Sequence, residues 1–216
     1  MEEKEEYFIK QAISWWKNER RDFPWRRTND PYRILITEIL LRKTTANQVN
    51  SIYHEFFREF PSIHHLAVSS EEKLEKILYP LGMEKKRSKE LSKLSIYLVE
   101  NHRGQVPANI EKLLELHGVG RYTAGGVLCQ AYKKDTAMVD TNVVRVMIRY
   151  FGFESSRKRP RDDSKLWDFV EKLIPKGKCR DFNLGVIDFA TAICISKKPK
   201  CEICPLNKYC DYFKNL

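Results

Sequence analysis

The chain has 216 residues, 31% of them charged, with a formal net charge of +10 and an isoelectric point near 9.3. This length allows one large domain or two small ones, and the basic charge favours a polyanionic partner, most often nucleic acid and less often a membrane surface. No apolar run approaches the ~18 residues that a membrane span requires, and the acidic start MEEKEEYFIK lacks the features of a signal peptide. We therefore expect a cytoplasmic protein, whose six cysteines indicate metal binding or chemistry before disulfides.

Apolar residues recur at helical spacing along most of the chain, and no convincing period-two pattern appears. The first helix is predicted over YFIKQAISWW, and Asp30 followed by Pro31 predicts the start of the next one, PYRILITEILL. ANQVNSIYHEFFREF is predicted to be a helix that ends before Pro61. Ser69 and Glu72 form a capping-box pattern ahead of EKLEKIL.

The rest of the chain has the same helical character. YPLGM predicts a turn and RKRPRDD a surface loop, and the helices are expected at EKKRSKELSKLSIYLVE, NIEKLLEL, YTAGGVLCQAY, DTNVVRVMIRYF, SKLWDFVEKLI and NLGVIDFATAIC. The predicted fold class is therefore all-α.

The segment LHGVGRYTAGG, residues 116–126, predicts a tight turn between two helices, because glycine permits positive φ angles and close backbone approach. The backbone N–H groups at the start of the second helix attract a phosphate. We expect Gly118 and Gly120 to hold one DNA phosphate, a contact that positions a backbone without reading its sequence. Taken alone, this segment also fits an ordinary helix–helix turn.

Four cysteines are separated by six, two and five residues near the end of the chain: Cys194, Cys201, Cys204 and Cys210. Four thiolates in so short a segment are expected to converge on one metal centre, and both zinc and a [4Fe–4S] cluster take four cysteines. The single C-x2-C pair and the wider steps favour the cluster. Cys129 and Cys179 lie outside the pattern and are expected to be core residues.

Taken together, these features resemble the helix-hairpin-helix DNA glycosylases of the endonuclease III superfamily. LHGVGRYTAGGV is similar to the family's hairpin, MVDTNVVRV to the segment that carries its catalytic aspartate, and the cysteine spacing to its [4Fe–4S] loop. The similar segments follow the family's order, from FPWRRTNDPY to Cys210. The resemblance implies cleavage of an N-glycosidic bond in duplex DNA after the target nucleotide has been flipped out.

The resemblance also implies an architecture. A six-helix barrel domain that includes the hairpin is expected over residues 29–136, and a cluster domain over residues 1–28 and 137–216. The active-site cleft is expected between them. The implied cofactor is a [4Fe–4S] cluster, and the implied partner of the monomeric protein is double-stranded DNA containing a mismatch.

Tyr122 stands where endonuclease III carries a lysine, just after the hairpin. That lysine amine attacks the sugar C1′ and forms a Schiff base, which permits strand cleavage. A phenol, with a pKa near 10, cannot form an imine. We therefore expect base removal with little or no cleavage of the abasic strand; a packing role for Tyr122 is the alternative.

The identity of the excised base is indicated by the segments around the expected site. Glu38 aligns with a glutamate of the MutY-type adenine glycosylases, but their C-terminal domain is expected to be absent, because the sequence ends six residues after Cys210. ITEILLRKTTA, GVGRYT and DFNLG resemble most closely the small MIG-type thymine–guanine mismatch glycosylases. The expected reaction is excision of thymine or uracil opposite guanine, in base excision repair. The alternative is a MutY-type adenine glycosylase without the C-terminal domain.

Two carboxylates are expected to carry the chemistry. Asp140 takes the place of the family's catalytic aspartate and is expected to face the positive charge of an oxocarbenium-like sugar; it also suits the N-cap of the helix TNVVRV. Glu38 lies in an apolar helix, where burial raises a carboxyl pKa. We expect it to donate a proton or hydrogen bond to the leaving base, or to align water. A surface glutamate is the alternative.

Two loops match the family's wedges, which fill the space left by a flipped nucleotide. The matching residues are Met83 and Lys43, of which Lys43 replaces a glutamine common in relatives and suits a phosphate contact equally well. We expect Arg42 to recognise the opposite guanine. Three neighbouring basic residues are expected either to add salt-dependent affinity for DNA or only to form a solvated helix face: Lys85, Lys86 and Arg87.

A function of another class is a DNA-binding module without catalysis that uses the cluster as a scaffold or redox sensor. The presence of both Glu38 and Asp140 argues against it. In the enzyme, we expect the cluster to be structural and to take no part in the chemistry.

Overall fold

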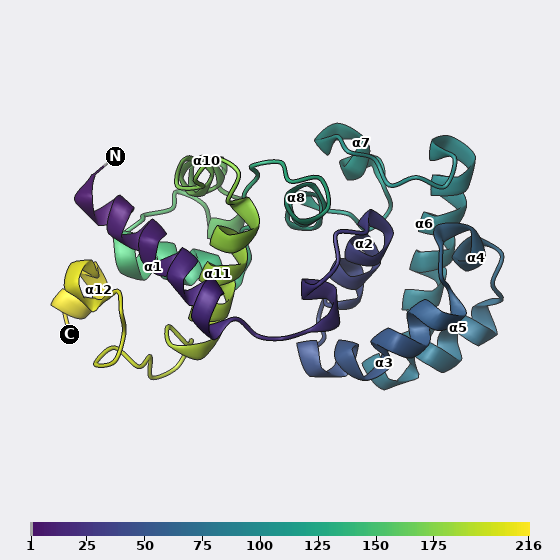
Figure 1. Ribbon diagram of the computed structural model, residues 1–216, viewed down its shortest axis with the longest axis horizontal. Helices are drawn as coiled ribbons and strands as arrows, with labels where there is room; N and C mark the ends of the chain where they lie inside the picture. The colour runs from purple at the N-terminus through teal and green to yellow at the C-terminus, as the bar shows by residue number, and fades with distance from the viewer. Residues whose placement is uncertain (1) are drawn as a thin grey trace. The chain divides into compact units, whose positions relative to one another are not determined.

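The computed structural model describes residues 2–216, which form helices and loops without a β-strand (Figure 1). The predicted all-α class is therefore confirmed. The α-helices are α1 (Glu3–Glu19), α2 (Pro31–Leu40), α3 (Ala46–Glu59), α4 (Ile63–Ala67), α5 (Glu71–Leu78), α6 (Glu84–His102), α7 (Ile110–Glu115), α8 (Arg121–Gln130), α9 (Thr141–Phe151), α10 (Ser164–Lys172), α11 (Cys179–Ala192) and α12 (Asp211–Lys214). Short 3-10 helices cover Pro24–Arg26, Tyr79–Leu81, Pro160–Asp162 and Asn207–Tyr209. None of the helices in residues 2–216 is long and apolar enough to cross a membrane.

The chain divides into two compact units. The hairpin unit is Asp22–Tyr132, and the cysteine unit combines the residues up to Arg21 with Lys133–Leu216. The segment Pro24–Arg26 belongs to the hairpin unit because the buried Trp25 is part of its hydrophobic core. We describe each unit by itself.

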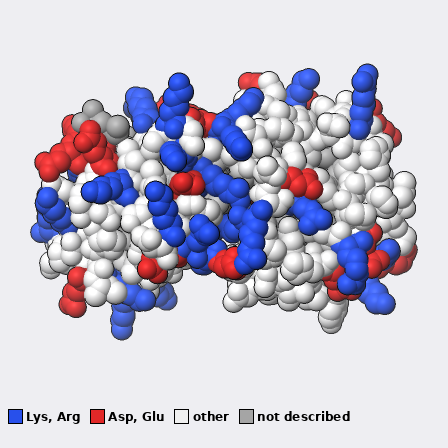
Figure 2. Space-filling model, in the orientation of Figure 1, with Lys and Arg blue, Asp and Glu red and all other residues white. Residues whose placement is uncertain are grey.

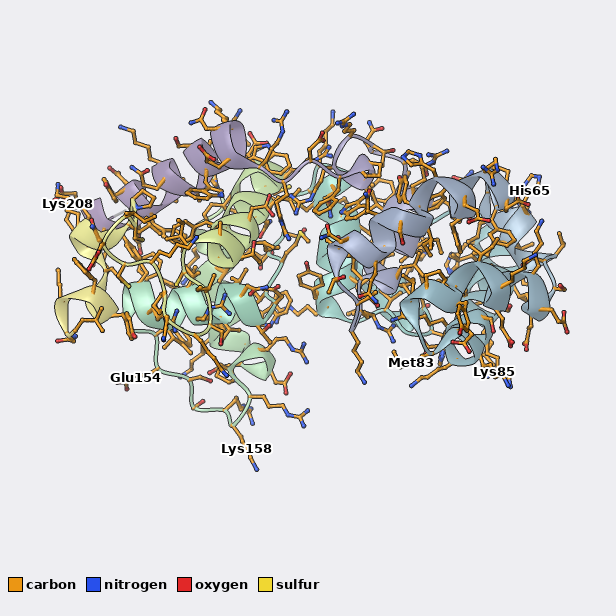
Figure 3. All side chains as sticks on the ribbon, turned by 90° about the horizontal axis from the view of Figure 1, so that it is seen from below. His65, Met83, Lys85, Glu154, Lys158 and Lys208 are labelled. Carbon is orange, nitrogen blue, oxygen red and sulfur yellow. The ribbon has the colours of Figure 1, made fainter. Side chains whose placement is uncertain are left out.

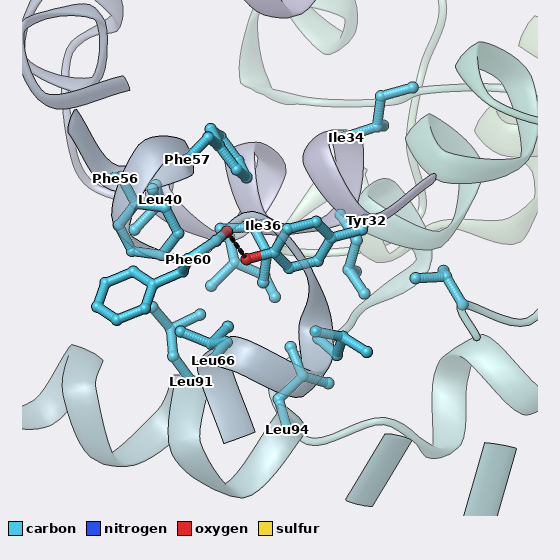
Figure 4. Packing of buried hydrophobic residues seen from close by; sticks show 14 of the residues in the cluster. Tyr32, Ile34, Ile36, Leu40, Phe56, Phe57, Phe60, Leu66, Leu91 and Leu94 are labelled. Carbon is cyan, nitrogen blue, oxygen red and sulfur yellow. Dashed lines mark hydrogen bonds between the residues drawn. The ribbon is translucent and has the colours of Figure 1, made fainter. Parts of the chain in front are cut away.

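The core of the hairpin unit surrounds α2. This helix is buried on nearly all sides, which is typical of a helix that is apolar all round. Aromatic side chains of α3 pack against it, and the Tyr32 hydroxyl donates a 2.7 Å hydrogen bond to the carbonyl of Phe60 (Figure 4). Because α2 also lies beside α8, its polar residues are held against the helix that follows the glycine hairpin.

The caps of two helices test the sequence predictions. The Asp30 carboxylate accepts hydrogen bonds from the backbone at the start of α2, as predicted. The predicted capping box of Ser69 and Glu72 is wrong: α5 is capped by Ser70, whose hydroxyl accepts from the backbone N–H of Lys73 at 3.3 Å. The Ser69 hydroxyl instead donates to the carbonyl of Leu66 at the end of α4, at 2.7 Å.

In the cysteine unit, α1 and α11 pack at close range. A Cβ atom on Gly185 would lie 2.1 Å from the carbonyl oxygen of Ala12, so only glycine permits this approach. Phe8 of α1 packs against the rings of Tyr150 and Phe182. These contacts hold α9 on α11, and α9 begins directly after Asp140.

Candidate functional site

The glycine hairpin connects α7 to α8. Gly118 has φ +78°, a backbone conformation that favours glycine, and a Cβ there would lie 2.9 Å from the Arg42 guanidinium. Gly120 is the N-cap of α8 and supplies no capping side chain, and a Cβ there would meet no atom within 4 Å. Both glycines are exposed, whereas Leu116 and Val119 are buried and anchor the turn. The hairpin therefore presents backbone to the surface at a helix N-terminus, which is suited to an anion.

Glu38 is buried, with 7% of its surface exposed, so the alternative of a surface glutamate is wrong. Its Oε1 accepts a 2.9 Å hydrogen bond from the side-chain amide of Gln130, which is also buried and ends α8. Burying a carboxyl group is costly unless hydrogen bonds compensate it. Tyr122 lies half-buried in the first turn of the same helix, α8.

Asp140 is the N-cap of α9. Its Oδ1 accepts hydrogen bonds from the backbone N–H groups of Asn142 and Val143, both at 2.8 Å, and its Oδ2 accepts from the Asn142 side-chain amide at 2.8 Å. The capping role considered from the sequence is therefore confirmed. Three donors at a helix N-terminus hold the carboxylate in one orientation and stabilise its negative charge.

Asn183 fixes the backbone that leads to Asp140. It is buried, its Oδ1 accepts from the Met138 N–H at 3.0 Å, and its amide donates to the carbonyls of Thr136 and Cys179 at 2.9 Å. The role of this asparagine, which lies in the DFNLG segment, was not predicted from the sequence. An asparagine inside an apolar helix, which must find hydrogen-bond partners when buried, was the available signal.

A chain of hydrogen bonds connects Asp140 to the first cysteine of the loop. The amide oxygen of Asn142 accepts from Nη2 of Arg145 at 2.9 Å, and Nε of Arg145 donates to the carbonyl of Cys194 at 2.7 Å. Both residues lie on α9, three positions apart, and so on one face of the helix. The orientation of the aspartate thus depends on the cysteine loop of the same unit.

The four-cysteine segment begins two residues after α11 and ends at the N-cap of α12. Arg149 of α9 contacts both of its ends: Nη1 donates to Cys194 Sγ at 3.5 Å, and the Arg149 carbonyl accepts from Cys210 Sγ at 3.4 Å. Hydrogen bonds to the cysteine sulfurs are one of the means by which proteins set the reduction potential of an iron–sulfur cluster. All four thiols are partly buried.

Burial and mutual proximity perturb the pKa values of three of the thiols. Burial raises the pKa of the Cys204 thiol to about 11, and the other three cysteines add to this increase. Burial and the neighbouring thiols also raise the pKa of Cys201 and of Cys210. Within residues 2–216, no three His, Cys, Asp or Glu side chains are gathered tightly enough to hold one metal ion. Four partly buried cysteine thiols in one short segment are nevertheless a donor set that both an iron–sulfur cluster and a zinc ion accept.

The two predicted wedge residues share an unusual backbone conformation. Lys43 has φ 57° and Met83 has φ 54°, both in the left-handed region that residues other than glycine rarely adopt. Both are exposed, and Met83 projects outward from the ribbon in Figure 3. Such a conformation costs about 1–3 kcal/mol per residue and persists only where surrounding structure imposes it.

Arg42 links its own loop to the hairpin. Its Nη1 donates to the carbonyl of Gly118 at 2.6 Å, and its Nη2 pairs with the Glu90 carboxylate at 3.2 Å. Recognition of a guanine by Arg42 stays a prediction.

The charged run at the start of α6 divides between surface and interior. Lys85 and Lys86 are exposed, whereas Arg87 is buried, so the prediction of a three-residue basic surface is wrong for Arg87. Figure 2 shows Lys and Arg side chains distributed over the visible face, with acidic ones interspersed. This distribution agrees with the net charge of +10.

Two family models match the chain. Residues 36–172 match the HhH-GPD superfamily of base excision DNA repair proteins. Residues 194–210 match the iron–sulfur binding domain of endonuclease III, a segment whose first and last residues are Cys194 and Cys210. The prediction of an iron–sulfur cluster is thereby confirmed.

Individual proteins are similar over almost the whole chain. The thymine/uracil-DNA glycosylase of Methanothermobacter thermautotrophicus is 43% identical over 98% of this chain and 95% of its own length. A solved structure of a thermostable thymine-DNA glycosylase superposes with a TM-score of 0.95 at 43% identity, covering 99% of this chain and 98% of that one. The adenine DNA glycosylase of Buchnera aphidicola (subspecies Acyrthosiphon pisum) is 34% identical, over 94% of this chain and 58% of its own length.

Proposed function

Because the chain belongs to the HhH-GPD superfamily of base excision DNA repair proteins, we propose that it is a monofunctional DNA glycosylase that excises thymine or uracil mispaired with guanine. The observation that carries this proposal is the 43% identity with a thymine/uracil-DNA glycosylase along 98% of the chain. The adenine relative is less similar and is matched over only 58% of its length. The proposed partner is duplex DNA carrying a G·T or G·U mismatch, bound by one copy of the chain.

In the proposed reaction, the bond between the sugar C1′ and the base nitrogen breaks, and its electron pair leaves with the base. Water adds to C1′, and its proton completes the balance when the base nitrogen is protonated. The sugar passes through an oxocarbenium-like state. Asp140 supplies the negative charge that stabilises this cation, and the three donors on its carboxylate keep it oriented before substrate binds.

Glu38 is assigned to the leaving base. It donates a proton or a hydrogen bond to the departing thymine or uracil, or aligns the attacking water. Its burial and the hydrogen bond from Gln130 support this role, because a carboxyl group removed from solvent and held at one angle is pre-organised for it.

Tyr122 accounts for the absence of strand cleavage in the proposal. A phenol cannot form the Schiff base through which a lysine would open the sugar, so the product is an intact abasic strand. The exposed Gly118 and Gly120 are proposed to hold a phosphate through the backbone at the start of α8. Lys43 and Met83 are proposed to fill the space left by the flipped nucleotide.

The iron–sulfur group is proposed to be a [4Fe–4S] cluster held by Cys194, Cys201, Cys204 and Cys210. When bound, it crosslinks the loops between α11 and α12 and contributes no step to the reaction. Arg149 and Arg145 hold the same loop from α9.

The proposal is tested with end-labelled duplexes containing G·T, G·U, G·A and oxidised-guanine·A pairs. Each is incubated with the protein and divided into halves with and without hot alkali. Breaks in the T or U strand that need alkali support a monofunctional pyrimidine glycosylase. Breaks at A would replace the proposal by the adenine alternative, and breaks without alkali would overturn the role of Tyr122. Binding without any excision would leave a DNA-binding module.

A further inference from the structure

Arg87 is buried in the middle of a charged run. Only 6% of its surface is exposed, although the sequence around it is EKKRSKE. Burial lowers the pKa of the Arg87 guanidinium, and the nearby Arg42 lowers it further. Burying a guanidinium costs free energy unless its N–H donors find hydrogen-bond acceptors. The acceptors that surround Arg87 therefore indicate why it is buried here.

The partners of Arg87 belong to two separate segments: the end of α2 with the loop that follows it, and the loop before α6. Nε donates to the carbonyl of Gly82 at 2.9 Å. Nη1 donates to the carbonyl of Leu40 at 3.3 Å, and Nη2 donates to the carbonyl of Arg42 at 2.9 Å and to the Thr44 hydroxyl at 2.5 Å. A guanidinium is planar and offers five donors in a rigid fork, so it fixes both loops at once.

Two of these carbonyls belong to the peptide groups that precede Lys43 and Met83. The φ angle of a residue is the rotation between that residue and the peptide plane before it, which contains the carbonyl of the preceding residue. A hydrogen bond to the Arg42 carbonyl therefore restrains φ of Lys43, and a hydrogen bond to the Gly82 carbonyl restrains φ of Met83. These are the two residues with left-handed backbone in the candidate wedges.

We propose that Arg87 is a positioning residue that holds the peptide groups 42–43 and 82–83, and with them Lys43 and Met83, in the conformation in which both project toward DNA. The proposal rests on the proposed function. Because the strained conformations are imposed during folding, they need not be formed when DNA binds. Arg42 extends the connection to the hairpin through the Gly118 carbonyl, so three DNA-facing loops of one unit are held together.

The first experiment measures hydrogen exchange in the full-length protein and needs no enzymatic activity. The variant Arg87→Met removes the fork and keeps an apolar stem; the matched control Arg58→Met removes an exposed arginine on α3 of the same unit. In R87M the amide exchange of segments 40–44 and 79–83 is expected to rise about tenfold or more, and in R58M to stay at the wild-type level. Unchanged exchange in either segment of R87M overturns the proposal.

The second experiment measures flipping and excision. A 2-aminopurine beside the mispaired thymine reports unstacking, and single-turnover assays report excision. In R87M both are expected to fall about tenfold or more, while affinity for a matched duplex stays near wild type. Arg87→Lys, which restores the charge without the fork, is expected to recover only part of the loss. An equal loss of affinity for matched DNA would make Arg87 a phosphate contact instead.

A double-mutant cycle separates positioning from general stability. If Arg87 acts through the wedge, the excision rate of the double variant, R87M with Met83→Ala, falls by less than the product of the two fold-losses measured for the single variants. Independent effects contradict the proposal. If R87M does not fold, R87K provides the comparison in all three measurements. A wild-type protein that excises neither thymine nor uracil would refute the proposed function, whereas the hydrogen-exchange result would still decide the role of Arg87.

Discussion

Asp140 is proposed to have two roles, capping α9 and stabilising the sugar cation, and two substitutions separate them. Asp140→Asn keeps a side-chain oxygen that accepts from the backbone N–H groups of Asn142 and Val143 but removes the charge. Asp140→Ala removes both the cap and the charge. Comparison of the two variants therefore assigns each effect to its cause.

The magnitudes follow from the contacts. Asparagine and aspartate are about equally good N-caps, so Asp140→Asn should change the free energy of unfolding by less than about 0.5 kcal/mol, whereas loss of a cap costs about 1–2 kcal/mol. For a chain of this length, that loss corresponds to a Tm about 2–8 °C lower for Asp140→Ala. Both variants lack the carboxylate, and removal of one such electrostatic contact lowers the rate by about 10²–10³-fold.

Asp163 provides the matched control. It caps α10 in the same unit, and its carboxylate accepts from the Lys165 N–H at 3.0 Å. Asp163→Ala should lower Tm to a similar extent as Asp140→Ala and leave excision unchanged. The assays are thermal unfolding and single-turnover excision from a G·U duplex, with affinity for the same duplex measured separately.

The proposed electrostatic role of Asp140 is refuted if Asp140→Asn excises uracil within about threefold of the wild-type rate, since the charge would then be worth less than about 1 kcal/mol in the transition state. It is also refuted if Asp163→Ala slows excision as much as Asp140→Ala, because the lost activity would then reflect stability alone.

The remaining predictions concern the hairpin, the tyrosine and the cluster. Gly118→Ala forces a side chain onto φ +78°, which costs about 1–2 kcal/mol, and should weaken binding to duplexes of any sequence. The control is Gly177→Ala, which places a side chain on a similar φ of +69°. Equal DNA affinity of the two variants would refute the proposed phosphate contact of Gly118. Tyr122→Lys should give a covalent DNA adduct trapped by borohydride, and the absence of any adduct would place residue 122 away from C1′. Cys204→Ser should lose bound iron and the visible charge-transfer absorbance, whereas undiminished iron content would exclude Cys204 as a ligand.

Much of the fold and of the candidate site depends on local sequence. The all-α class follows from apolar residues at helical spacing, and the start of α2 from Asp30 followed by Pro31. The hairpin depends on Gly118, whose φ of +78° favours glycine in any surroundings. The iron–sulfur segment depends on cysteine spacing within one short stretch. These features could be predicted because each depends on residues that are near one another in the chain.

The tertiary structure decided which polar groups are buried and what they hold. Arg87 cannot be told from its exposed lysine neighbours by composition, because the face that α6 turns toward the end of α2 depends on how the two helices pack. The same holds for Asn183 and Arg145, each of which has hydrogen-bond partners 45 or more residues away in the chain. A buried donor must be satisfied, and the only acceptors available to it are those that folding brings near. The sequence by itself therefore determined the chemistry that the chain carries, and only the folded structure determined which residues orient it.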